Sequence, residues 1–220
     1  MPSGTFNHLL WAGLVLVLAV LGFMTRDNLG VFYERVGQLE VRDVPEDGAV
    51  MLLWKGQIDA PMESRISEAF ERYRALRRTF VLSLSSPGGS VAHGARVVRL
   101  LGKMGETHTI ETVVEAGHSC ASMCVPVYLQ GQRRTAAASA KFLFHRVSFS
   151  EYLARDQLAV PEQAKDRETD RFFAKYFKQA GVPEAWISKV RAAMAGNADI
   201  WKTGRELVDE NAGIVQELRD

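Results

Sequence analysis

Two residues of this 220-residue chain have the types and surroundings that acyl transfer requires. Ser122 lies between small residues at the start of an apolar stretch, residues 121–129, which predicts a helix. His145 directly follows a second apolar run, residues 142–144, which is typical of a strand. A hydroxyl becomes a nucleophile when an adjacent base accepts its proton. The sequence therefore indicates Ser122 as a candidate nucleophile and His145 as its candidate base.

A glycine turn upstream could complete such a site. Pro87-Gly88-Gly89 follows an apolar strand and opens a helix. Glycines there allow positive φ angles that leave backbone N–H groups free. The N–H of Met123, at a helix start, would also have no intrahelical partner. We therefore predict an oxyanion hole formed by the N–H groups of Gly89 and Met123; the alternative is a plain strand-to-helix turn.

Other assignments compete with this one. A lone serine in an apolar helix is most simply a small packed side chain, and each of the five histidines could be an ordinary surface or core imidazole. His118, one turn before Ser122, is the alternative base. The glycine turn does not resemble a phosphate loop, because the Gly-Lys-Ser/Thr ending of that motif is missing.

Both cysteines of the chain, Cys120 and Cys124, flank the candidate nucleophile. Two cysteines cannot form a disulfide scaffold or complete a four-cysteine zinc site, so we expect no metal. We expect two small buried side chains that pack the helix of Ser122, because free Cys packs as a small hydrophobe. A disulfide is the alternative in an oxidising compartment, although helical geometry at this spacing would strain it.

Alternating elements must position these residues. The expected strands are 38–41, 49–54, 79–84, 108–114 and 141–144, and the expected helices between them are 61–78, 91–104 and 121–129. Residues 149–194 are predicted to be mostly helical, followed by a short loop, a helix over 203–210 and a strand over 213–215. This order predicts an α/β fold built from strands joined by right-handed helical crossovers.

Composition restricts the class of protein. Apolar residues make up 47% of the chain and charged residues 24%, which is typical of a globular domain with one core. The net charge is +1 and no basic stripe stands out, so we expect no nucleic-acid partner.

An apolar run near the N-terminus predicts a membrane segment. Residues 9–24 contain no charge and no proline, and flanking residues extend the run toward the roughly 20 residues of a bilayer span. We assign residues 1–27 to a transmembrane or signal-anchor helix, 28–48 to a connector and 49–220 to the folded domain. No clean cleavage site follows the run, so an anchor is favoured over a cleaved signal peptide.

The orientation of that anchor rests on few charges. Arg26 follows the run and no Lys or Arg precedes it, so a strict positive-inside count would leave the domain cytoplasmic by one residue. Single N-terminal segments more often lead an exported domain. We therefore expect a single-pass protein of a bacterial inner membrane with a periplasmic domain.

Together these motifs resemble the Clp protease proteolytic subunit family, whose crotonase-like fold also includes the signal peptide peptidases of the SppA type. The resemblance covers residues 49–215 and rests on three features: Ser-Pro-Gly-Gly-Ser-Val at 86–91, Ser122-Met123, and the strand that ends in His145. It implies stacked ββα units, here preceded by an N-terminal hydrophobic helix. It also implies Ser122 as nucleophile, His145 as base, and Gly89 and Met123 as the oxyanion hole.

The resemblance implies a third catalytic residue as well. Asp199 begins a stretch similar to the family's C-terminal motif and would orient His145 and stabilise its imidazolium form. Asp170 and Asp156 are alternatives, because an insert precedes the motif. The chain departs from the family by one extra residue between Gly117 and Ser122, and by Cys124 at a position where the family usually has glycine.

The function predicted from these features is a membrane-held serine peptidase without a cofactor. Its peptide substrate would bind as an added strand beside Gly88, Ser90 and Val91. Assembly of the family into rings implies a homo-oligomer. Two alternatives stay open: a catalytically silent binding or scaffold module, and an acyl-CoA enzyme that uses the glycine turn to hold a thioester enolate.

Overall fold

The computed structural model of the chain describes residues 37–148 and 161–219. The N-terminal apolar run 9–24 and the alternative acid Asp156 lie outside the described residues. Within the described ranges, no helix has the length and apolar character needed to span a membrane. The anchor expected from the sequence therefore stays a prediction.

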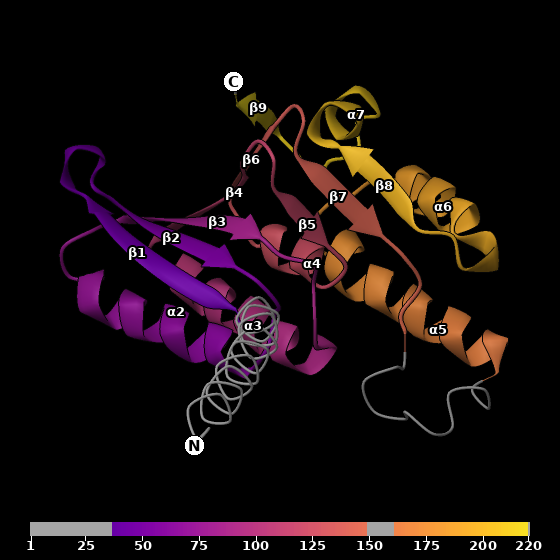
Figure 1. Ribbon diagram of the computed structural model, residues 1–220, viewed down its shortest axis with the longest axis horizontal. Coiled ribbons are helices and arrows are strands. Elements are labelled where there is room, and N and C mark those ends of the chain that lie inside the picture. The colour runs from indigo at the N-terminus through magenta and orange to yellow at the C-terminus, as the bar shows by residue number, and fades with distance from the viewer. Residues whose placement is uncertain (1–36, 149–160, 220) are drawn as a thin grey trace, which may run out of the picture. The chain divides into compact units, whose positions relative to one another are not determined.

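A six-stranded sheet forms one layer of a mixed α/β fold (Figure 1). Its strands, in spatial order, are β1 (Gln38–Val44), β2 (Ala49–Lys55), β3 (Thr79–Ser85), β4 (Thr109–Val114), β6 (Arg133–Ala137) and β9 (Glu217–Arg219). β1 runs antiparallel to β2 after the short turn η1 (Pro45–Asp47), and the other neighbours are parallel. β2 and β3 are nearly continuous apolar runs, as expected of strands covered on both faces.

Two amphipathic helices pack beside this sheet (Figure 1). α2 (Ala60–Tyr73) and α3 (Val91–Gly105) contact each other and bury one side each. The buried positions of α2 are Met62, Ile66, Ala69 and Phe70, and those of α3 are Gly94, Val97, Leu101 and Met104. Both sets follow the helical spacing from which the helices were predicted. α2 ends at Tyr73, five residues before the predicted end.

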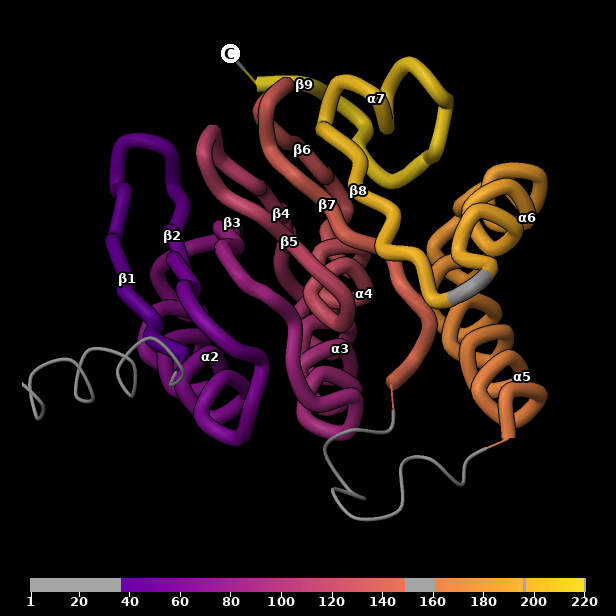
Figure 2. Tube along the Cα trace, turned by 45° about the vertical axis from the view of Figure 1, so that its right-hand side comes forward, coloured from indigo at the N-terminus to yellow at the C-terminus, as the bar shows by residue number. Residues whose placement is uncertain are grey.

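A second sheet has three short strands, which Figure 2 shows next to each other. β5 (Ser119–Ala121) pairs parallel with β7 (Lys141–Phe144), which pairs antiparallel with β8 (Ile200–Thr203). The predicted helix over 121–129 is therefore wrong at its start, because Ala121 is held in a ladder opposite Leu143. The helix that follows, α4, covers only Cys124–Tyr128.

The C-terminal part is largely helical, as predicted. It contains α5 (Glu162–Phe173), the π-helical turn η3 (Ala174–Lys178), α6 (Glu184–Ala193), the turn η4 (Ala195–Asn197) and α7 (Gly204–Asp209). The predicted strand over 213–215 is wrong: Ile214 and Val215 are buried in a loop, and β9 begins at Glu217. β6 was not predicted, and β8 was predicted as a loop.

Candidate active site at the Ser122 turn

One cavity brings the two candidate catalytic side chains together. It has a volume of about 250 Å³ and is lined by Ser122, His145 and the Gly88-Gly89 turn. Its apolar wall comes from β7, α5 and η3, through Leu143, Phe172, Phe173 and Phe177. The cavity thus places a hydroxyl, an imidazole and a glycine turn beside an apolar surface.

Ser122 occupies a constrained turn between β5 and α4. Its φ angle is +54°, in the left-handed region that residues other than glycine rarely adopt. Hydrogen bonds fix the turn on both sides: the N–H of Ser122 donates to the Leu143 carbonyl (3.0 Å), and its own carbonyl accepts from the N–H of Val125 (3.0 Å). A conformation of this kind costs about 1–3 kcal/mol and persists where the surroundings over-determine it, commonly at functional sites.

The glycine turn lies directly against the Ser122 turn. A Cβ added to Gly88 would lie 2.7 Å from the carbonyl oxygen of Ala121 and 2.8 Å from the Cβ of Ser122. Gly88 also has a φ of +95°. Two hydrogen bonds join the segments: Ser86 N–H to the Ser119 carbonyl (2.8 Å) and Ala121 N–H to the Ser86 carbonyl (2.9 Å). Only glycine at position 88 allows this close approach.

The two N–H groups predicted for the oxyanion hole have no acceptor among the residues that the structure describes. Among the described residues, neither Gly89 nor Met123 donates a backbone hydrogen bond. The bonds beside Gly89 hold the turn in place, because Ile58 donates to the Gly88 carbonyl (2.8 Å) and accepts from the N–H of Ser90 (3.0 Å). Unpaired N–H groups beside a nucleophile are what an oxyanion requires, and this role stays a prediction for both residues.

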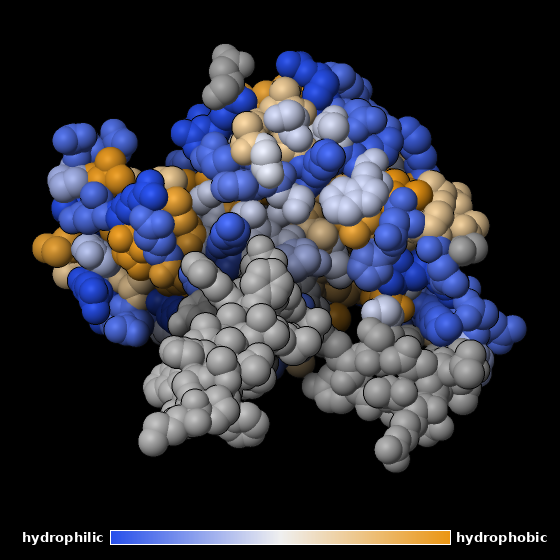
Figure 3. All heavy atoms as spheres, viewed as in Figure 1, coloured by the Kyte–Doolittle hydropathy of each residue, from blue (hydrophilic) through white to orange (hydrophobic). Residues whose placement is uncertain are grey.

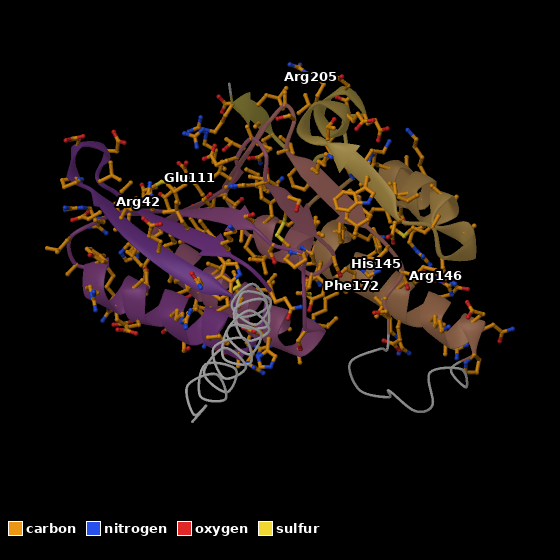
Figure 4. The ribbon with its side chains drawn as sticks, in the orientation of Figure 1. Arg42, Glu111, His145, Arg146, Phe172 and Arg205 are labelled. Atoms are coloured by element: carbon orange, nitrogen blue, oxygen red, sulfur yellow. A yellow bond between two sulfur atoms is a disulfide. The ribbon has the colours of Figure 1, made fainter. Side chains whose placement is uncertain are left out.

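His145 lies at the end of β7, with its ring nitrogen Nδ1 2.6 Å from the main-chain oxygen of Arg146. Figure 4 shows His145 near Arg146 and Phe172. A carbonyl oxygen can only accept, so the proton of the neutral ring is on Nδ1 and the lone pair is on Nε2. No hydrogen bond joins Ser122 and His145 in the described structure. Catalytic hydrogen bonds are often formed only once substrate is bound.

Asp199 lies close in register but does not reach the cavity. Phe144 and Ile200 are the last paired residues of β7 and β8, so His145 and Asp199 occupy the next positions across the ladder. The Asp199 side chain is exposed and is not part of the cavity wall. No hydrogen bond between Asp199 and His145 is formed within the described ranges. Its role as the orienting acid stays a prediction.

The alternative residues lie elsewhere. His118 is exposed and does not line the cavity. Asp170 is on α5, where its carboxylate pairs with Arg191 at 2.6 Å. Of the residues predicted to bind substrate, Gly88 and Val91 line the cavity, whereas the hydroxyl of Ser90 caps α3 by accepting from the N–H of His93 (3.4 Å).

The two cysteines form a disulfide, which corrects the expectation of two free packed thiols. Cys120 lies in β5 and not on a helix, and its Cα is 5.2 Å from that of Cys124, within the range that a disulfide requires. Both residues are fully buried. The disulfide closes a short covalent ring that contains Ser122 and Met123. Free thiols were expected because the helix was predicted to begin at residue 121, and helical geometry at this spacing would strain a disulfide.

The site also contains residues that the sequence pattern did not single out. The aromatic wall comes from α5 and η3. Their charged and apolar pattern predicted helices, but not that their aromatic side chains line the same cavity as Ser122. Within the described ranges, no group of three or more His, Cys, Asp or Glu side chains is placed to hold a metal ion.

Comparison with known proteins supports the architecture. No protein-family model matches the chain, and no curated protein does. Among solved structures, ClpP1 from Listeria monocytogenes is similar, with a TM-score of 0.58 and 17% identity over 80% of this chain and 93% of that chain. A point mutant of the same protein gives a TM-score of 0.56 and 18% identity over the same shares. Identity this low shows the fold alone: the chain has a ClpP-like fold.

Proposed function

We propose that this protein is a serine peptidase in which Ser122 is the nucleophile and His145 the general base. The observation that carries the proposal is the cavity that Ser122 and His145 share with the Gly88-Gly89 turn. The positive φ of Ser122 supports it, as do the N–H groups of Gly89 and Met123, which have no partner within residues 37–148 and 161–219. The ClpP-like fold is consistent with the same chemistry.

The reaction follows from these groups. The Oγ of Ser122 attacks the peptide carbonyl while Nε2 of His145 accepts its proton. The oxyanion that forms is stabilised by the N–H groups of Gly89 and Met123. His145 then protonates the leaving amine, and water, activated by the same imidazole, hydrolyses the ester on Ser122. Asp199 would stabilise the imidazolium after a local rearrangement, since it makes no bond to His145 here.

The cavity also indicates which substrates fit. Phe172, Phe173 and Phe177 form an apolar wall beside Ser122, so we propose that a large apolar side chain of the substrate occupies it. The peptide backbone would lie along the turn at Gly88 and Val91 as an added strand. The mechanism requires no cofactor.

We further propose that the domain acts on the periplasmic side of a bacterial inner membrane. Disulfides persist in oxidising compartments, so the Cys120–Cys124 bond is consistent with export. The apolar run 9–24 would be the anchor.

We also propose that the protein forms a homo-oligomer. β1 is an edge strand of the six-stranded sheet. Apolar residues gather over the region of β1 and β2 on the face shown in Figure 3. Within β1, Val41 is exposed, whereas the other exposed residues of the strand are polar or charged. An edge strand presents backbone N–H and C=O groups with which a strand of another chain can pair.

Labelling of the full-length protein with a fluorophosphonate probe tests the catalytic proposal. Wild type should be labelled, Ser122→Ala should not, and His145→Gln should be labelled at least about a hundredfold more slowly. Ser119→Ala, three residues away in β5, is the matched control and should be labelled like wild type. A folded wild type that is not labelled would overturn the proposal and favour the non-catalytic binding module.

A further inference from the structure

Arg146, the residue after His145, connects three segments of the fold. Its side chain is 10% exposed. Nη1 lies 2.7 Å from Glu162 of α5 and 2.7 Å from the side-chain oxygen of Asn197 in η4, and Nη2 lies 3.0 Å from Asp166 of α5. One guanidinium thus ties the end of β7 to the start of α5 and to the turn that precedes Asp199.

Stability alone is a weak explanation for this arrangement. The Nε atom of Arg146 is buried and has no hydrogen-bond partner in the described structure. An unsatisfied buried donor is costly, more so on a charged group. The two carboxylates are largely exposed, at 60% for Glu162 and 54% for Asp166, and exposed partners of an ion pair return little stability. An arrangement with this cost requires another explanation.

The main chain of the same residue holds the candidate base. The carbonyl oxygen of Arg146 accepts the hydrogen bond from Nδ1 of His145 at 2.6 Å. The next residue is fixed too, since Val147 N–H donates to Oγ1 of buried Thr169 on α5 at 3.1 Å. The carbonyl that orients the imidazole is therefore held between two attachments to α5.

We propose that Arg146 is a positioning residue for His145. Its guanidinium anchors the 145–147 segment to α5, so that its carbonyl keeps the imidazole in the tautomer with hydrogen on Nδ1 and the lone pair on Nε2. That tautomer is the one in which Nε2 can accept a proton from a serine. The catalytic consequence rests on the proposed function, whereas the tautomer itself does not.

NMR of the full-length protein with ¹⁵N-labelled histidine tests the proposal directly, because the ring nitrogens report the tautomer. The His145 signals are assigned with His145→Gln. Wild type should show the Nδ1–H form of His145. Arg146→Met keeps the main-chain carbonyl but no longer anchors it, so it should lower the ratio of the Nδ1–H form to the Nε2–H form about fivefold, as expected when one hydrogen bond is no longer held in place. A predominant Nε2–H form in wild type, or an unchanged ratio in Arg146→Met, would overturn the proposal.

Arg191→Met is the matched control. Arg191 is 17% exposed and joins α6 to α5, through Asp170 at 2.6 Å and more distantly through Asp166 at 4.0 Å. Its loss therefore removes ion pairs from α5 while Arg146 keeps its own shorter pairs with Glu162 and Asp166. Its tautomer ratio should equal that of wild type, and a shift as large as that of Arg146→Met would contradict specific positioning.

If Arg146→Met does not fold, Glu162→Gln combined with Asp166→Asn removes the partners of Arg146 at exposed positions. This double variant should shift the ratio in the same direction, and an unchanged ratio would count against the anchor.

Fluorophosphonate labelling of the same variants separates this proposal from the proposed function. Arg146→Met should be labelled about tenfold more slowly and Arg191→Met at the wild-type rate. A tautomer shift in a protein that is never labelled would support the positioning and overturn the peptidase. If wild type is labelled but the tautomer of His145 is the same in Arg146→Met, the peptidase proposal would be supported and the positioning proposal overturned.

Discussion

Gly88 lies so close to Ser122 that a Cβ on Gly88 would be 2.8 Å from the Cβ of Ser122. The contact joins two segments that are more than thirty residues apart in the chain. It places the glycine turn beside the nucleophile turn, and it leaves no space for a side chain between them.

Gly88→Ala should therefore slow fluorophosphonate labelling by about a hundredfold, because the new methyl group displaces Ser122 by a substantial fraction of an ångström. Gly117→Ala is the matched control. Gly117 also has a positive φ, +76°, but nothing lies within 4 Å of its added Cβ. It should lose about 1 kcal/mol of stability through backbone strain and keep its labelling rate. Equal labelling of the two variants would contradict the close contact.

Breaking the Cys120–Cys124 disulfide should destabilise the protein by about 2 kcal/mol, as expected for a short loop. Urea unfolding of Cys120→Ala, Cys124→Ala and the double variant measures this. Either single change already breaks the bond, so the three variants should be similarly destabilised, whereas additive losses would indicate two independent thiols. Alkylation of the denatured, unreduced wild type should modify no cysteine.

Phe172→Ala should change substrate preference more than intrinsic reactivity. Phe172 is partly exposed and lines the cavity beside Phe173 and Phe177. Loss of its ring should lower kcat/KM about tenfold for peptides with a large apolar residue at the cleavage site. Labelling by a small fluorophosphonate should stay at the wild-type rate. An equal loss for peptides with small residues would exclude the apolar wall as a specificity surface.

Glu210 should make the stability of the protein depend on acidic pH. Burial alone would raise the pKa of Glu210, but hydrogen bonds from Lys202, Trp186 and Lys189 outweigh it and hold the pKa at about 2, below the ordinary 4.5. A carboxylate with a depressed pKa stabilises the fold above pH 4.5, and that contribution is lost as the pH falls from 4.5 toward 2.

Glu210→Gln should accordingly be about 2 kcal/mol less stable than wild type at pH 7, and the difference should shrink as the pH falls below 4.5. Urea unfolding at pH 7, 4 and 3 measures it. Glu184→Gln is the control: Glu184 pairs with Lys178 at a surface where its side chain is 75% exposed, so it should have little effect at any pH. A pH-independent difference for Glu210→Gln would show that lost packing, not charge, is responsible.

The local pattern of apolar residues was sufficient to predict the main strands and helices that contribute to the core. The apolar run of β3, the glycine turn and the amphipathic α3 were all expected near their observed positions, because burial on one face produces a period that short segments display. β6, with Arg133 and Arg134 in five residues, shows no such period. It is a strand because β4 and β9 pair with it.

The residue types needed for acyl transfer were likewise evident in the amino-acid sequence. Ser122, His145 and the glycine turn stood out only as a combination, because each of them taken alone has a simpler structural explanation. The shared cavity, the disulfide and the Arg146 carbonyl at Nδ1 of His145 became visible only in three dimensions. Each of these features depends on a contact between distant segments or on the backbone conformation of Ser122. The φ of Ser122 is +54°, and the turn that it forms ends β5 at a position where the sequence predicted a helix. Apolar periodicity records which face of a segment is buried, but not which segment covers it. For β7 the tertiary structure decides this, since Phe144 packs against Phe177 of η3 and Trp186 of α6.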